Sequence, residues 1–122
     1  MADNKQYVTQ IQEKGSVMIS EDVIATIVAH ATNDVEGVVS INVKPGSDIV
    51  ELIGKKNWGK GIRVVIKEDD TLEIDCNITI SYGHSVVNVA KAVQDAICGA
   101  LDDMTGISIA AINVNVCGIV RQ

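Results

Sequence analysis

Residues 72–119 constrain the fold most, because they read as a strand, a turn, a long helix and a second strand. Apolar side chains first take every second position, as in a strand with one buried face. These alternating residues are Leu72, Ile74, Cys76, Ile78, Ile80 and Tyr82. Apolar residues then recur every three or four positions, which predicts a helix with one apolar stripe. The stripe comprises Val86, Val89, Ala90, Val93, Ile97, Ala100, Leu101 and Met104. Gly106 is expected to end this helix in a left-handed conformation, and residues 107–120 to form the next strand.

The last strand changes its alternation partway along. Ile109 has one parity, whereas Ile112 and Val114 have the other, and a bulge near Ala110 and Ala111 reconciles the two. The helix stripe must then cover the apolar face of the strands. The opposite face is expected to be polar and open to water or to a partner. It would carry Arg63, Lys67, Glu73, Asp75, Asn77, Thr79, Asn113 and Asn115.

The rest of the chain supplies further elements in order. Residues 1–14 are polar and are expected to form a flexible tail, with a short helical turn around residues 7–11 as the alternative. A short strand at residues 15–19 precedes Ser20, which is a good N-cap for a helix. The apolar stripe of that helix is Val23, Ile24, Ile27, Val28 and Ala31. Strands follow at residues 39–43 and 62–67, with a helical turn at residues 48–53 between them.

These elements define a two-layer α+β fold of order β-α-β-β-β-α-β. Two helices pack on one face of a mostly antiparallel sheet. The chain of 122 residues suits a single domain over residues 15–120. Its core must be aliphatic, because the chain has no Phe, one Trp and two Tyr.

Charge and cysteine content exclude several classes of protein. A net charge of −6 argues against a nucleic-acid-binding domain, which needs a basic face. No apolar run approaches the length of a membrane span, and the N-terminus lacks the pattern of a signal peptide. Cys76, Cys98 and Cys117 form no C-x-x-C pair, which fits reduced thiols in a cytoplasmic protein.

A glycine- and lysine-rich loop at residues 54–61 comes close to a phosphate-binding P-loop. Gly54, Gly59 and Lys60 have the required spacing, but Gly61 replaces the Ser or Thr that holds Mg²⁺. The loop also precedes a strand, whereas a P-loop opens a helix. Nucleotide hydrolysis is therefore disfavoured.

The same loop concentrates positive charge in an acidic chain. The candidate partner-binding residues are Lys55, Lys56, Trp58, Lys60, Arg63 and Lys67. One interpretation is a solvated loop, and the other is a contact for an acidic protein segment or a membrane surface. Trp58 is either an interface anchor or a lid over the core.

No catalytic, cofactor-binding or metal-binding residue is predicted. The acidic residues at 68–75 do not have the spacing of a Ca²⁺ loop. His30 and His84 lack a Cys or His at the spacing of a metal pair. Cys76 is expected to be an inert core thiol, while the exposure of Cys98 and Cys117 is left open. We therefore expect a protein that is not an enzyme.

Several short runs resemble the alkaline shock protein family of envelope-stress proteins from Gram-positive bacteria. They begin at Asp34 (DVEGVV), Ile53 (IGKKNWGKGI), Ile80 (ISYG), Val89 (VAKAVQ), Met104 (MTG) and Val114 (VNVCGIV). The resemblance implies a small cytoplasmic protein without catalytic activity, acting in cell-envelope homeostasis. It also implies self-association in some relatives, a separate membrane-anchor protein as partner in others, and a link to lipid metabolism in others.

The sequence therefore favours a non-enzymatic cytoplasmic interaction module, a scaffold or regulator. Its partner would be a protein, and the candidates are a membrane-anchor protein and a second copy of the chain. The alternatives are a regulator that senses a small ligand or acyl group in a pocket between helices and sheet, and a cryptic enzyme.

Overall fold

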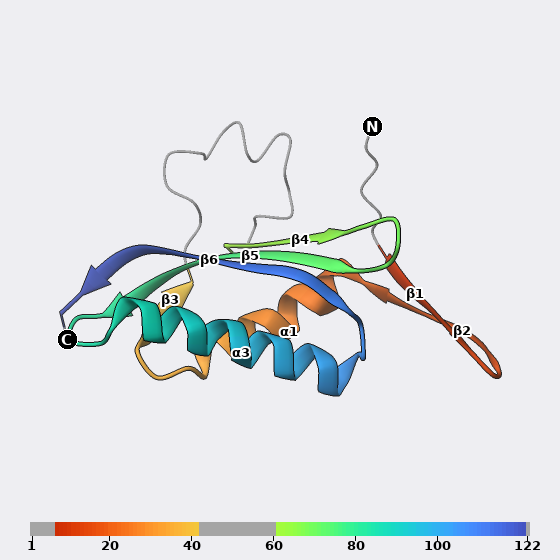
Figure 1. Cartoon of the computed structure of the whole chain (residues 1–122), viewed down its shortest axis with the longest axis horizontal. Helices are drawn as coiled ribbons and strands as arrows, with labels where there is room; N and C mark the ends of the chain where they lie inside the picture. The colour runs from red at the N-terminus through yellow and green to blue at the C-terminus, as the bar shows by residue number, and fades with distance from the viewer. Residues whose placement is uncertain (1–6, 42–60, 122) are drawn as a thin grey trace.

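The computed structural model describes residues 7–41 and 61–121 of the chain. Their elements are β1 (Tyr7–Gln12), β2 (Gly15–Ser20), α1 (Glu21–Asn33), β3 (Val38–Ile41), β4 (Ile62–Ile66), β5 (Leu72–Ser81), α3 (Val86–Met104) and β6 (Ile109–Val120). Both helices lie on one side of the main sheet, which gives two layers (Figure 1). The predicted α+β fold and the predicted order of elements are confirmed, with one further strand at the front.

The main sheet is built on β5, which has partners on both edges. β3 pairs antiparallel with the end of β5 around Ile80, and β4 pairs antiparallel with its beginning, from Leu72 to Cys76. β6 runs parallel to β5 along the whole other edge. The parallel pairing follows from α3, because parallel neighbours need a crossover connection of this length.

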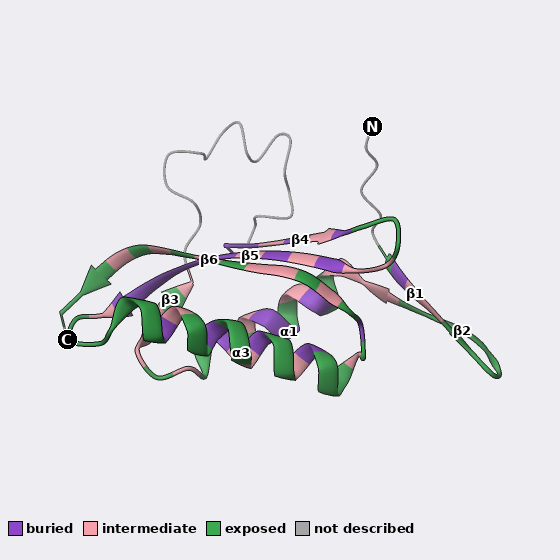
Figure 2. Ribbon diagram, viewed as in Figure 1, coloured by how far each residue is buried: buried purple, intermediate pink, exposed green. Residues whose placement is uncertain are grey.

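An aliphatic core fills the space between the helices and the inner face of the sheet. The inner side chains of β5 are fully buried, and so are the central stripes of α1 and α3 (Figure 2). The apolar stripes predicted from the sequence extend beyond the buried part of each element. Val23, Tyr82, Val86 and Met104 are exposed. Each lies in the first or last turn of its helix, or just past the end of β5, where the opposite layer does not reach.

Local signals place the helix ends as the sequence predicted. The Ser20 hydroxyl accepts a hydrogen bond from the Val23 amide at 3.3 Å, which caps α1. Gly106 has φ +71° and donates from its amide to Leu101 O at 3.0 Å. This left-handed residue ends α3, as expected.

The predicted bulge in β6 is confirmed. Ile109 lies opposite Leu72, but Ala111 lies opposite Glu73, so Ala110 has no partner on β5. A second irregularity leaves Cys117 without a counterpart. The extra residue of the first bulge, Ala110, shifts the alternation by one position. The apolar side chains that follow it in β6 therefore lie on the core side.

The flexible tail expected over residues 1–14 is wrong for Tyr7–Gln12, which form β1. β1 and β2 make an antiparallel hairpin that extends away from the main sheet (Figure 1). Val8 is 1% exposed, and Gln10 Nε2 donates to Thr105 O at 2.7 Å. Contacts this distant in sequence are invisible to local periodicity. The alternative prediction, a helical turn around residues 7–11, is also wrong, because these residues form a strand.

The strand predicted at residues 39–43 is observed as β3 over Val38–Ile41. The hairpin tip predicted between β4 and β5 is confirmed, because Asp70 N donates to Lys67 O at 2.9 Å. The helical turn predicted at residues 48–53 and the loop at residues 54–60 lie outside the described residues.

Candidate functional site

The candidate site is the outer face of the main sheet, meaning the side of β4, β5 and β6 that faces away from the helices. The alternation of each strand sends its polar side chains to this side. Strand register then sets neighbours: Arg63 lies opposite Asp75, and Asn113 lies opposite the same residue on the other edge. The outer face comprises Arg63, Val65, Lys67, Glu73, Asp75, Asn77, Thr79, Asn113 and Asn115.

Asp75 is the centre of the polar network on this face. Arg63 Nη1 donates to Asp75 Oδ2 at 2.7 Å, and Asn113 Nδ2 donates to Asp75 Oδ1 at 2.9 Å. The Asp75 side chain is only 13% exposed. A half-buried carboxylate with two donors is held in one position, because a charge-assisted hydrogen bond is stronger than a neutral one.

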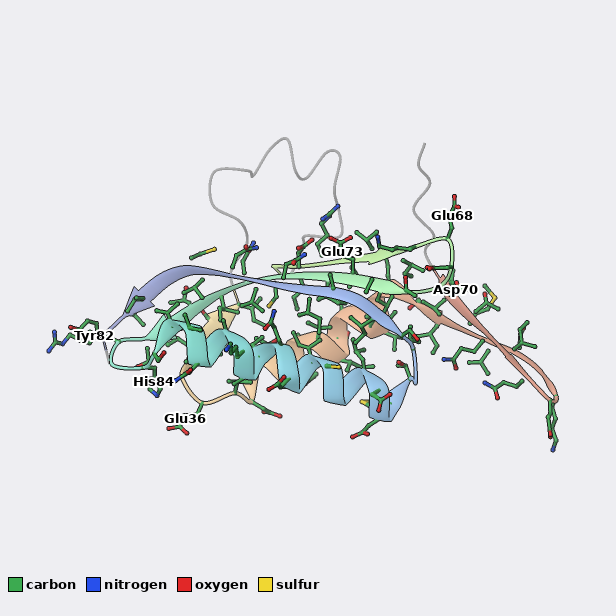
Figure 3. The ribbon with its side chains drawn as sticks, viewed as in Figure 1. Glu36, Glu68, Asp70, Glu73, Tyr82 and His84 are labelled. Atoms are coloured by element: carbon green, nitrogen blue, oxygen red, sulfur yellow. The ribbon has the colours of Figure 1, made fainter. Side chains whose placement is uncertain are left out.

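A second, looser pair lies beside the first. Lys67 Nζ lies 3.8 Å from Glu73 Oε1, and both side chains remain partly exposed. Figure 3 shows Glu73 on the side of the sheet away from the helices, with Glu68 and Asp70 at the turn between β4 and β5. Positive and negative groups therefore alternate across the outer face.

Two residues of the outer face are buried. The expectation that this face is open to water is therefore wrong for Asn77 and Thr79. Asn77 is 1% exposed, and Thr79 is also buried. Asn77 Oδ1 accepts from Asn115 Nδ2 at 2.9 Å, but Asn77 Nδ2 has no hydrogen-bond acceptor among the described residues. A buried donor without an acceptor costs about 1–3 kcal/mol.

The structure places only part of the predicted basic site. Arg63 and Lys67 lie on the outer face, each beside an acid of β5. The remaining candidates, Lys55, Lys56, Trp58 and Lys60, lie outside the described residues. Within the described part of the face, the basic groups are balanced by acids. The sequence missed the burial of Asn77, and alternation could not reveal it, because Glu73 and Asp75 also lie between apolar neighbours.

The histidines and cysteines lie apart from this face or from one another. His84 Nε2 is 3.9 Å from Glu36 Oε2, in the segment between β5 and α3 (Figure 3). Cys98 and Cys117 are exposed, which settles the open question of the sequence. Cys76 is buried, and its burial raises the pKa of the thiol to about 11. It is the inert core thiol that the sequence predicted.

Residues 7–41 and 61–121 contain no candidate metal-binding cluster. No group of three or more His, Cys, Asp or Glu side chains in that part of the chain could hold an ion. None of the helices there is long and apolar enough to cross a membrane.

A shallow apolar groove lies between the start of α1 and the end of α3. It has a volume of about 370 Å³ and is open to solvent. Its lining residues are Asp22, Val23, Thr26, Ile27 and Met104. Its surface is almost entirely apolar, so it could hold an apolar group but offers little to orient a polar substrate.

Together these features define a small α+β domain with an aliphatic core and a networked polar sheet face. Residues 9–121 match the model of a protein family whose description gives a cell envelope-related function. The chain therefore belongs to this family, the alkaline shock protein family. The resemblance that the sequence runs indicated is confirmed.

Two curated relatives are similar over most of their length. The uncharacterized protein YqhY of Bacillus subtilis is 37% identical over 105 residues, which cover 86% of this chain and 77% of YqhY. The uncharacterized protein Spy1535 of Streptococcus pyogenes is 33% identical over 108 residues, covering 88% of this chain and 81% of Spy1535.

The fold is also found among solved structures. A variant of the MamM CTD superposes with a TM-score of 0.56 at 16% sequence identity, over 80% of this chain and 96% of that one. At that identity the likeness concerns the fold alone.

Proposed function

We propose that this chain is a non-enzymatic interaction module in the cytoplasm, a scaffold or regulator that serves the cell envelope. Its family has a cell envelope-related function. The proposed binding surface is the outer face of the sheet, and the partner is a protein, through which the chain could be held at the membrane. A link to lipid metabolism, which the family resemblance implies, belongs to the same proposal.

The observation that carries the proposal is the network of fixed polar groups on this face. Arg63 and Asn113 both donate to Asp75, so the three side chains hold one another in place. Rigid polar groups lose little conformational entropy on binding, so they suit recognition of peptide groups. Alternating charge on such a face favours specificity for one partner over non-specific attraction.

The charge pattern also supports a binding role over catalysis. Catalysis needs a cleft with titratable groups in hydrogen-bond reach of a reacting atom. On the outer face, the carboxylates of Glu73 and Asp75 are engaged with Lys67, Arg63 and Asn113. They behave as structural partners of basic and amide groups.

The test is site-specific photo-crosslinking in the native cell. A photoreactive residue at Val65 on the outer face is expected to capture one discrete protein. The same residue at His30, on the exposed side of α1, is the matched control and should capture none. Equal capture at both positions, or no product at Val65, would overturn the proposal.

A second candidate function rests on the apolar groove beside Val23 and Met104. Its volume of about 370 Å³ lies at the small end of ligand pockets. In this reading the chain is a regulator that senses an apolar ligand such as an acyl group. Native mass spectrometry of the purified chain should then show an adduct that the Val23→Lys variant loses. A wild-type spectrum without any adduct would remove this candidate.

A further inference from the structure

β6 has a hydrogen-bonded neighbour on one edge only. Its partner is β5, and no other strand of the described residues pairs with it. Gln94 Nε2, from α3, donates to Ile112 O at 2.9 Å and satisfies one backbone carbonyl of the strand. The strand is 12 residues long, whereas exposed edge strands in natural proteins are commonly short.

The residues of β6 lack the charge and the proline that protect many edge strands. Natural edges carry lysine, proline, inward-pointing charge or β-bulges, which hinder pairing with another chain. Charged residues make up 21% of this chain. From Ile109 to Val120, however, there is no charged residue and no proline. Two bulges, at Ala110 and Cys117, leave a regular segment between them.

The core-side residues of β6 are incompletely covered. Ile112, Val114 and Val116 are half-buried, whereas their neighbours on β5 are fully buried. All six side chains point toward the helices. The difference arises because β5 has strands on both edges and β6 has one. A further strand beside β6 would bury more of these branched side chains, which favours pairing.

We propose that β6 pairs antiparallel with β6 of a second copy of this chain, about a two-fold axis, so that two main sheets become one. A second copy suits this edge because it supplies a second uncharged strand. The net charge of −6 opposes association of two copies, and a contact through β6 avoids placing like charges directly opposite each other. A two-fold contact uses the same patch on both copies.

Strand geometry restricts where the axis can lie. Residues directly opposite each other in an antiparallel pair lie on the same face of the sheet. The two-fold axis must therefore lie where a residue faces its own copy, and not where it faces the copy of the next residue. An axis at Val114 lies within the regular segment. It sets Asn113 opposite Asn115 of the partner subunit and Ile112 opposite Val116 of the partner subunit. Polar side chains then meet on the outer face, and branched apolar ones meet on the core side.

Such a contact is of moderate size. A regular segment of six residues supplies about six backbone hydrogen bonds, within the range of about 5–15 direct hydrogen bonds in protein interfaces. We therefore expect a reversible dimer, and the outer face of each sheet remains available to another protein.

The first test is disulfide trapping at the axis. In a Cys76→Ala, Cys98→Ser, Cys117→Ser background, which also removes the thiol opposite Val114 on β5, the Val114→Cys variant should form a covalent dimer on mild oxidation. Self-opposed residues of such a pair have Cα atoms roughly 4.5–5.5 Å apart, which a disulfide can bridge. The matched control is Val116→Cys, on the same face of the same strand, which should crosslink far less because its counterpart is Ile112. Equal crosslinking by both variants, or none by Val114→Cys, would overturn the proposal.

The second test measures association without crosslinking. Sedimentation of the wild-type chain over a range of concentrations should show a species of twice 13.0 kDa. Asn115→Lys should raise the dissociation constant roughly tenfold or more, because the two introduced positive charges are carried by residues diagonally across the axis, whose backbones are about 7–8 Å apart. Asn88→Lys, on the exposed side of α3, adds the same charge and should leave association unchanged. A monomer at every concentration, or equal effects of the two variants, contradicts the proposal.

Discussion

β5 and the β1–β2 hairpin are both formed by strand pairing, yet they differ in what covers them. β5 has partners on both edges and two helices over one face. The hairpin pairs only with itself, and its strands are mostly exposed, whereas β5 is mostly buried (Figure 2). Backbone hydrogen bonds contribute little net free energy in water, so burial distinguishes the two regions.

The hairpin depends on a few contacts with the rest of the molecule. Val8 enters the core, and Gln10 donates to Thr105 O beyond the end of α3. Ile19 is partly buried against the core, whereas the other large apolar side chains, Tyr7, Ile11, Val17 and Met18, are exposed. An isolated two-stranded hairpin is at best marginally stable. The hairpin is therefore anchored by a few contacts near Val8 and Gln10, whereas β5 is packed along its whole length.

The largest effect should come from a charge under the helix that covers β5. Val89 is 4% exposed and faces the core. Val89→Asp is expected to lower the free energy of unfolding by several kcal/mol, because it buries an unpaired carboxylate. That loss is comparable to the total stability of a small domain, about 5–15 kcal/mol. Urea unfolding followed by circular dichroism measures it.

The control for that charge is Met18→Asp on the exposed hairpin. A surface substitution of this kind changes stability by only about 0.5 kcal/mol. If Met18→Asp destabilised the chain as much as Val89→Asp, the hairpin would be part of the core and the comparison would fail.

The same truncation in the two regions gives the next effect. Ile78→Ala in β5 should cost about 2–5 kcal/mol, through lost burial and the cavity that remains. Ile78 is fully buried, whereas Ile11 in β1 is 83% exposed. Ile11→Ala should therefore change the unfolding free energy by no more than about 0.5 kcal/mol. Paired urea titrations decide it, and similar midpoints for the two variants would contradict the difference in cover.

A pH dependence of stability in the alkaline range should arise from Cys76 in β5. Burial raises the pKa of the Cys76 thiol from its ordinary 9.0 to about 11, against a smaller opposing effect of Thr32. Between these values the unfolded chain binds fewer protons than the folded chain, so stability is full below pH 9 and falls as pH rises toward 11. The loss is on the order of 2 kcal/mol. Unfolding at pH 8 and at pH 10.5 measures it. Cys76→Ala should reduce the decline and Cys98→Ala should not, and an unchanged decline in Cys76→Ala would exclude this cause.

The smallest effect should be confined to the hairpin. Val8→Ala removes two buried methyl groups, worth about 1.5 kcal/mol at roughly 0.8 kcal/mol each. Hydrogen exchange should show faster exchange of β1 and β2 amides, while β5 amides keep their protection. Equal loss of protection in both regions would show that the hairpin and the sheet open together.

The sequence predicted the sheet better than the hairpin, for a physical reason. β5, α3 and the bulge at Ala110 follow from periodicity, because a buried face imposes its period on every residue of the element. β1 has only Val8 buried, so no period marks it. Its position depends on contacts such as Gln10 with Thr105, 95 positions away.

The candidate site was predicted by face but not by pairing. Alternation alone put Arg63, Lys67 and Asn113 on the outer face. Which acid each of them meets depends on strand register, and register is set across the whole sheet. The burial of Asn77 depends likewise on its neighbours in the assembled fold.

The parallel pairing of β5 with β6 also fixes an order of assembly. β4 and β5 are joined by a tight turn and can pair as soon as both have been synthesised. β6 can join β5 only after α3 has folded back across the sheet, because loop closure precedes the reward of a non-local contact. A nascent chain that has not yet extruded Val120 from the ribosome therefore exposes one whole side of its central strand.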